Sequence, residues 1–168
     1  MNIHPAIIAI VVGLALFPLA GLALCYVHTA IHESGHAAAA RYFGLRIDEF
    51  RVHPWNGYCA YVREGATMLR SQERIEFEDM VITMAGPGAN VLAAMLFPLL
   101  LLLPVPEYTL YIVTAFSMMN LLTGLISFMG INKDPQQDSM RMRQHYRRWR
   151  HLKETIWEPR PDEIVSDD

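Results

Sequence analysis

Charged residues are few in this chain, and three long stretches contain none. Only 18% of the 168 residues are charged, and the uncharged stretches are residues 1–32, 80–106 and 108–132. Each stretch is longer than the roughly 20 apolar residues that an α-helix needs to cross the hydrocarbon core of a bilayer. This distribution argues against a soluble enzyme, a disordered chain and a disulfide-stapled secreted domain. We therefore expect an integral membrane protein with spanning helices at about 6–28, 81–103 and 108–131.

Basic residues are absent from the first 40 residues and from the turn at 104–107 between the second and third spans. All 14 lysines and arginines lie in two segments, 41–74 and 133–160. The positive-inside rule places such segments in the cytoplasm. We therefore expect a multi-pass protein with its N-terminus outside and its C-terminus in the cytoplasm. A cleaved signal peptide is not expected, because its first region would be basic.

Cysteine is also rare. Cys25 lies in the first expected span, and Cys59 lies in the expected cytoplasmic segment that follows it. Their spacing matches no CxxC pair and no metal-binding motif. A disulfide is disfavoured on the reducing side of the membrane, so we expect two free thiols.

The segment 45–64 is rich in β-branched and aromatic residues, and Asn56-Gly57 lies between its two runs. An Asn-Gly pair in that setting is a strong signal for a tight β-hairpin turn. The helix of the first span is expected to continue up to Gly44, because glycine suits the residue after a helix end. We therefore predict a small cytoplasmic hairpin between the first two spans.

Residues Ser139–Ile156 have the periodicity of an amphipathic helix. Its apolar stripe consists of Met142, Tyr146, Trp149, Leu152 and Ile156, with basic residues around it. This pattern favours a helix on the anionic cytoplasmic leaflet. An ordinary solvated basic helix is the alternative, and nucleic-acid binding is less favoured than either. The predicted fold is an all-α membrane protein, with a three-transmembrane-helix core and the hairpin over 1–138, and this helix with an acidic tail over 139–168.

The sharpest chemical signal is the HExxH motif His32-Glu33-Ser34-Gly35-His36. Residues four apart on a helix share one face and lie about 6 Å apart along the axis, so both imidazoles can bind one metal ion. Glu33, held beside that ion, can take a proton from water and pass it to a leaving amine. His28 lies on nearly the same face but too far from His36 to share the ion. We expect His28 to pack near the membrane boundary or to line the cavity.

Two further motifs follow in chain order. The segment Ala85-Gly86-Pro87-Gly88-Ala89-Asn90 contains a GPxxN element, and Asn120-Leu121-Leu122 resembles the start of an NxxP…DG element. Over roughly residues 10–140, the chain resembles the site-2 protease family of intramembrane zinc metalloproteases. The resemblance implies a catalytic Zn²⁺ bound by His32 and His36, with Glu33 as general base. It also implies that Asn90 lines the catalytic cavity and supports the substrate or the reacting oxyanion. Asn120 could do the same or simply form a hydrogen bond between helices.

The third element departs from the family pattern. Thr123 stands where proline is usual, and no Asp-Gly follows. The family's third zinc ligand is the aspartate of that element, and the candidates here are Asp134 and Asp138. Asp138 is preferred, because Asp138-Ser139 is the nearer match to Asp-Gly. Asp134 precedes a proline and can simply shape a turn, whereas Asp138 could instead cap the following helix.

The expected activity is that of a zinc metalloendopeptidase that hydrolyses membrane-anchored proteins near the cytoplasmic leaflet of the lipid bilayer. The resemblance also implies β-structure beside the site, where a strand edge could pair with an extended substrate. Two rivals stay open. One is a non-proteolytic membrane protein that uses the same scaffold for binding or regulation. The other is an HExxH protease whose third ligand is a later glutamate, which is disfavoured because Glu107, the only glutamate between the second span and the tail, is expected outside. The sequence does not indicate an oligomeric state.

Overall fold

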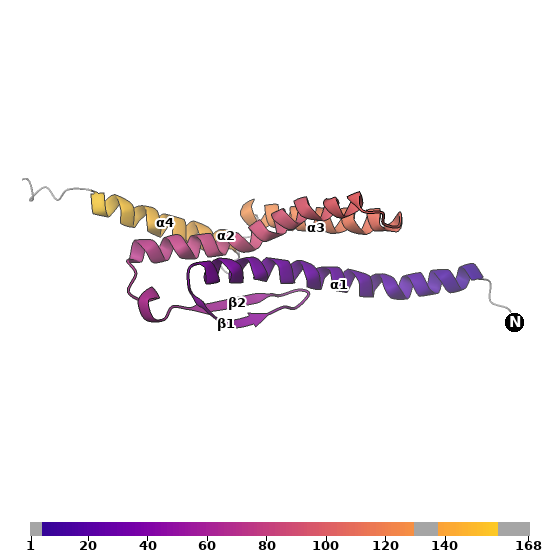
Figure 1. Cartoon of the computed structure of the whole chain (residues 1–168), viewed down its shortest axis with the longest axis horizontal. Helices are drawn as coiled ribbons and strands as arrows, with labels where there is room; N and C mark the ends of the chain where they lie inside the picture. The colour runs from indigo at the N-terminus through magenta and orange to yellow at the C-terminus, as the bar shows by residue number, and fades with distance from the viewer. Residues whose placement is uncertain (1–4, 130–137, 158–168) are drawn as a thin grey trace, which may run out of the picture.

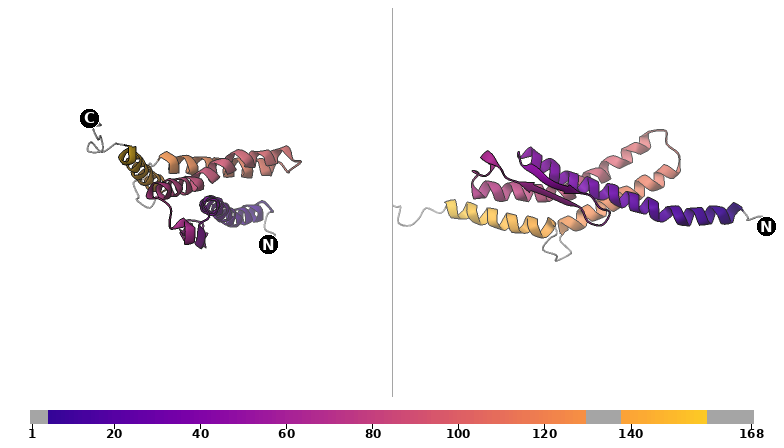
Figure 2. Two further views of the ribbon diagram at one scale, coloured as in Figure 1. Left: turned by 60° about the vertical axis from the view of Figure 1, so that its left-hand side comes forward. Right: turned by 90° about the horizontal axis from the view of Figure 1, so that it is seen from below.

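A computed structural model describes residues 5–129 and 138–157, with side chains for 16–129 and 138–154. Its elements in chain order are α1 (Pro5–Tyr42), β1 (Arg46–Arg51), β2 (Tyr58–Val62), the 3-10 helix η1 (Gly65–Thr67), α2 (Gln72–Leu96), the 3-10 helix η2 (Phe97–Leu102), α3 (Tyr108–Met129) and α4 (Asp138–Trp157). The helices run close to the long axis of the molecule (Figure 1). α2 packs against α1, α3 and α4, and the hairpin lies on the side of α1 away from α2 (Figures 1 and 2).

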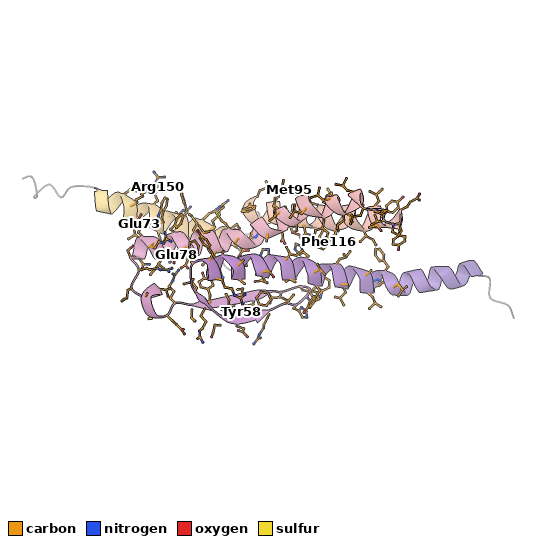
Figure 3. All side chains as sticks on the ribbon, in the orientation of Figure 1. Tyr58, Glu73, Glu78, Met95, Phe116 and Arg150 are labelled. Carbon is orange, nitrogen blue, oxygen red and sulfur yellow. The ribbon has the colours of Figure 1, made fainter. Side chains whose placement is uncertain are left out.

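Two stretches of helix in the described part of the chain are long and apolar enough to cross a membrane. They are Gln72–Leu102, which comprises α2 and η2, and Tyr108–Met129, which is α3. Large apolar side chains on them are exposed, such as Met95, 69% exposed and labelled in Figure 3. Such an apolar surface suits lipid better than water. The first expected span lies within α1, whose residues 5–15 have no described side chains, so it stays a prediction.

The hairpin confirms the predicted β-structure but corrects its turn. β1 and β2 are antiparallel, with Arg51 opposite Tyr58, so residues 52–57 form a longer connection in place of a two-residue Asn-Gly turn. Pro54 in this connection has no N–H to donate to a strand ladder. Its carbonyl oxygen accepts a hydrogen bond of 3.4 Å from the hydroxyl of Thr29 on α1. The connection is thus anchored to α1 immediately before the HExGH motif.

The end of α1 and the start of α2 agree with the local sequence signals. α1 ends at Tyr42, and Gly44 follows with a φ of +73°, a backbone conformation that glycine adopts without strain. Ser71 precedes α2, and its hydroxyl accepts a hydrogen bond from the backbone N–H of Arg74. Both helices are therefore terminated by residues that suit those positions.

α4 confirms the predicted C-terminal helix and gives its apolar stripe a protein partner. Trp149 packs against Phe77 of α2, with ring centroids 6.2 Å apart, and Nδ1 of His145 lies 2.6 Å from a carboxylate oxygen of Glu76. Tyr146, expected in the stripe, is 46% exposed, and His145 faces α2 in its place. Contact between the exposed face of α4 and lipid stays a prediction. The acidic tail beyond residue 157 lies outside the described residues.

A buried carboxylate, that of Glu78, ties these elements together at the end where α1 stops and α2 begins. The side chain of Glu78 on α2 is fully buried, and three arginines surround it. The closest nitrogens are 2.5 Å away for Arg63, 2.7 Å for Arg70 and 2.7 Å for Arg74. Arg70 also donates a hydrogen bond of 2.8 Å to the carbonyl oxygen of Phe43, just after α1. The network therefore links the segment between the hairpin and α2 to the end of α1.

Glu78→Gln should destabilise the fold without touching the candidate site. Removing one partner of a buried ion pair costs roughly 3–5 kcal/mol, and we expect the lower end because Arg74 is 54% exposed and can regain water. Chemical or thermal unfolding in detergent micelles measures the loss. Glu154→Gln, which breaks an exposed pair with Arg150, is the matched control and should leave the unfolding midpoint unchanged. Equal midpoints for Glu78→Gln and the wild type would contradict a stabilising role.

Candidate metal centre

Three side chains that could bind a metal ion come together from two distant parts of the sequence. His32 and His36 lie one turn apart on α1, and their Nε2 atoms are 3.2 Å from each other. Asp138, the first residue of α4, places Oδ2 at 2.9 Å from Nε2 of His32 and at 3.5 Å from Nε2 of His36. The structure thus brings together the three residues that the sequence predicts as ligands. Asp134, the alternative third ligand, lies outside the described residues.

The spacing of these donor atoms fits a metal ion. Tetrahedral zinc with bonds of about 2.0–2.2 Å places its ligand atoms about 3.3–3.6 Å apart. The three separations, 2.9, 3.2 and 3.5 Å, are close to these values. Two imidazoles and one carboxylate are also a donor set that suits catalytic zinc, because three protein ligands leave a fourth position open. His32, His36 and Asp138 could therefore hold a metal ion together.

Asp138 is poised to act as an anionic ligand. Burial opposes ionisation of its carboxyl group, but hydrogen bonds with His32 and His36 outweigh burial and hold the pKa of Asp138 well below its usual range. A carboxylate must be deprotonated to bind a metal. Asp138 meets that requirement at neutral pH.

Groups on α2 contact the Nδ1 atoms of both imidazoles, the ring nitrogens that do not face Asp138. Nδ1 of His36 lies 2.7 Å from the carbonyl oxygen of Ile82, and Nδ1 of His32 lies 3.0 Å from the carboxamide of Asn90. This close approach of α1 and α2 depends on two glycines. A methyl group at Gly35 would overlap the backbone of α2 at Ala85, and one at Gly86 would overlap the ring of His36. The glycines of HExGH and of GPxxN therefore serve one helix–helix contact beside the metal centre.

Glu33 faces the same cavity as the three candidate ligands. Its side chain is buried, with 7% of the residue exposed, and the cavity measures about 470 Å³. The cavity is also lined by the hairpin and by α2, α3 and α4, through residues that include Gly57, Tyr58, Tyr61, Thr83, Ser127 and Arg141. The predicted general base thus lies beside the candidate ligands in a space large enough for a peptide segment.

The connection between the strands covers Glu33 directly. A methyl group at Gly57 would overlap the carboxylate of Glu33 and would also meet Thr29. The resemblance already implied β-structure beside the site, but it did not indicate that Gly57 contacts Glu33. No local signal relates residue 57 to residue 33, because their contact exists only once the hairpin folds onto α1.

The two asparagines named in the sequence occupy different places. Asn90 contacts His32, whereas Oδ1 of Asn120 lies 3.0 Å from Nδ1 of His28. Asn120 is fully buried and also donates a hydrogen bond of 2.8 Å to the carbonyl oxygen of Phe116. His28 and Asn90 line a second cavity of about 220 Å³ that also reaches Glu33. His28 thus lies beside the site without joining the three candidate ligands.

Comparison with known proteins supports the grouping of these motifs. The model of the Peptidase M50B-like family matches residues 5–132, which include HExGH, GPxxN and Asn120 but end before Asp138. No curated protein sequence matches the chain significantly. Membership of this family implies a metallopeptidase, and its members are typically zinc-dependent. The chain therefore belongs to the Peptidase M50B-like family, which is of the site-2 protease type.

Proposed function

We propose that this protein is an intramembrane zinc metalloprotease that hydrolyses peptide bonds of membrane-anchored proteins near the cytoplasmic leaflet. One observation carries the proposal: the donor atoms of His32, His36 and Asp138 meet beside the buried Glu33, in a cavity open to a peptide. A purely structural metal site would need no such base. Membership of the M50B-like family supports the same reaction class.

Each residue then has a defined task. Zinc held by His32, His36 and Asp138 would supply Lewis-acid polarisation of the scissile carbonyl and would acidify water. Glu33 takes the proton of the attacking water and delivers it to the leaving amine. An amide N–H group of Asn90, which lines the smaller cavity, is a candidate to support the oxyanion. Asn120 is fully buried, lines neither cavity and bonds to His28 and Phe116, so we assign it to the contact between helices.

The hairpin offers a way to hold an unwound substrate. β2 pairs only with β1 among the described residues, and residues of β2 line the cavity beside the candidate ligands. An extended peptide can add to such a free strand edge through main-chain hydrogen bonds. A transmembrane substrate helix must unwind before its peptide bond can react, and this edge would satisfy the backbone groups that unwinding exposes.

The purified protein in liposomes tests the proposal with a single-span model substrate tagged at both ends. We expect two fragments whose new termini, read by mass spectrometry, lie within or next to the cytoplasmic end of the substrate's span. The rival, a non-proteolytic protein on the same scaffold, draws support from Thr123 in place of the usual proline. It predicts an intact substrate in a preparation that retains its metal.

Gly57→Ala should slow cleavage while leaving metal content and folding unchanged. The added methyl group would push the carboxylate of Glu33 from its place, and small displacements of reacting groups can cost about 10²-fold in rate. Initial rates on the model substrate measure the effect. Gly88→Ala is the matched control, because a methyl group there meets open space. Equal rates for Gly57→Ala and the wild type would show that the connection does not constrain Glu33.

The proposed topology places the N-terminus outside and the hairpin, α4 and the C-terminus in the cytoplasm, around a three-span core. It rests on the one-sided distribution of the 14 basic residues. In a variant without Cys25 and Cys59, a membrane-impermeant thiol reagent applied from outside should label Glu107→Cys. The same reagent should not label Glu64→Cys or Lys153→Cys until the membrane is permeabilised. Outside labelling of Lys153→Cys would reverse the placement of the active site.

A further inference from the structure

Asn90 is the partner of one ring nitrogen of His32. It lies on α2 with 1% of its surface exposed, and its carboxamide is 3.0 Å from Nδ1 of His32. The other ring nitrogen, Nε2, faces Asp138 and His36. His32 is thus held between the metal-binding side and a single carboxamide. The group that this carboxamide presents to Nδ1 decides which ring nitrogen carries the proton.

A histidine that binds a metal through Nε2 carries its proton on Nδ1, and that proton needs an acceptor. His36 meets this condition without ambiguity, because Nδ1 lies 2.7 Å from the carbonyl oxygen of Ile82, which can only accept. In the part of the chain that the structure describes, the hydrogen-bond partner of Nδ1 of His32 is Asn90. The oxygen of Asn90 must therefore face His32 when His32 is a ligand.

The carboxamide can serve either form of His32, because its two ends have the same shape and opposite hydrogen-bonding character. In the structure the amide nitrogen of Asn90 faces His32 and donates to Nδ1. His32 then donates from Nε2 to Asp138 at 2.9 Å. With its oxygen toward His32 it accepts the Nδ1 proton and leaves Nε2 free for a metal. Oδ1 of Asn90 is fully buried and has no hydrogen-bond partner among the described residues. Exchanging the two ends therefore breaks no hydrogen bond at that end.

We propose that Asn90 is a positioning residue that makes His32 a zinc ligand by accepting its Nδ1 proton; this inference rests on the proposed metal site. α2 then orients both ligand histidines, with the backbone at Ile82 for His36 and the side chain of Asn90 for His32. The amide nitrogen of Asn90 takes the position that Oδ1 leaves. That N–H group remains a donor, which is compatible with support of the oxyanion.

Zinc affinity of the purified full-length protein, measured by competition with a chromophoric chelator, tests this role in two variants. Asn90→Leu removes the acceptor at similar volume and should weaken zinc binding by about 10–100-fold, as losses of outer hydrogen-bond partners do. Asn90→Asp keeps an acceptor and should bind zinc about as tightly as the wild type. A role in packing alone would reverse this order, since leucine fits an apolar site and aspartate buries a charge.

Asn120→Leu is the matched control. It removes an equally buried asparagine that is bonded to His28, which is not among the three candidate ligands, so zinc affinity should not change. Nitrogen NMR of the zinc-loaded wild type gives a second reading that needs no variant, and it should show His32 protonated at Nδ1. Equal zinc affinity of Asn90→Leu and the wild type would overturn this role alone. His32 protonated at Nε2 in the zinc-loaded protein would overturn this role together with the assignment of Nε2 of His32 as a ligand atom. A wild type that binds no zinc would overturn the proposed function as well.

Discussion

Glu33→Gln should abolish nearly all peptide-bond cleavage while the protein keeps its zinc and its fold. Glutamine has almost the same shape as glutamate but cannot take a proton from water, and the loss of a general base costs about 10²–10⁴-fold in rate. Glu33 is not among the three candidate ligands, so metal content should not change. Initial rates on the tagged model substrate, with zinc content determined on the same preparations, measure both effects.

Glu107→Gln is the control for this substitution, because Glu107 is exposed and lies in the turn between η2 and α3, outside the cavity. It should cleave the substrate at the wild-type rate. Cleavage by Glu33→Gln at that same rate would rule out the proposed mechanism. Loss of zinc together with activity in Glu33→Gln would instead show that Glu33 acts mainly by holding the metal centre in place.

Asp138→Ala should lose both zinc and activity. Two histidines from one helix leave the ion short of the usual three protein ligands, and Oδ2 of Asp138 is the third donor in the cluster. The fall in zinc affinity should exceed the roughly 10–100-fold that follows from loss of an outer hydrogen-bond partner. Chelator competition and cleavage rates measure the two losses on one preparation.

Asp134→Ala provides the matched comparison, because Asp134 is the other candidate ligand close to the end of the third span. It should keep zinc and activity. If Asp134→Ala loses zinc and Asp138→Ala does not, the ligand assignment is wrong and the enzyme proposal survives. If neither variant loses zinc, the third donor of the site must lie elsewhere, and the non-proteolytic rival gains support.

The histidine pair and its base could be predicted because they depend on local geometry alone. A helix places residues four apart on one face whatever surrounds it, so HExGH already defines how His32, Glu33 and His36 lie. The third ligand is different. Asp138 is separated from His32 by 106 residues, and its position depends on where α4 begins and packs. The sequence favoured Asp138 over Asp134 only through the likeness of Asp138-Ser139 to Asp-Gly, because no Asp-Gly follows Asn120.

The contacts made by α4 and by the hairpin connection could not be predicted, for a related reason. An amphipathic stripe has the same periodicity whether it faces lipid or another helix, so the sequence did not show that Trp149 packs on Phe77. Asn56-Gly57 carried a correct signal for a chain reversal, but the six residues 52–57 are fixed by contacts with α1. The different partners of Asn90 and Asn120 likewise emerge only from the packing of α1 against α2 and α3.

Removal and return of zinc tests the central claim most directly. The purified wild-type protein in liposomes is stripped with a chelator, assayed on the tagged single-span substrate, and assayed again after one equivalent of zinc is restored. Cleavage should stop on stripping and return with zinc in the wild type, whereas stripped Glu33→Gln should rebind zinc and stay inactive. Cleavage that continues undiminished in the zinc-free wild type would contradict a metalloprotease built on His32, His36 and Asp138.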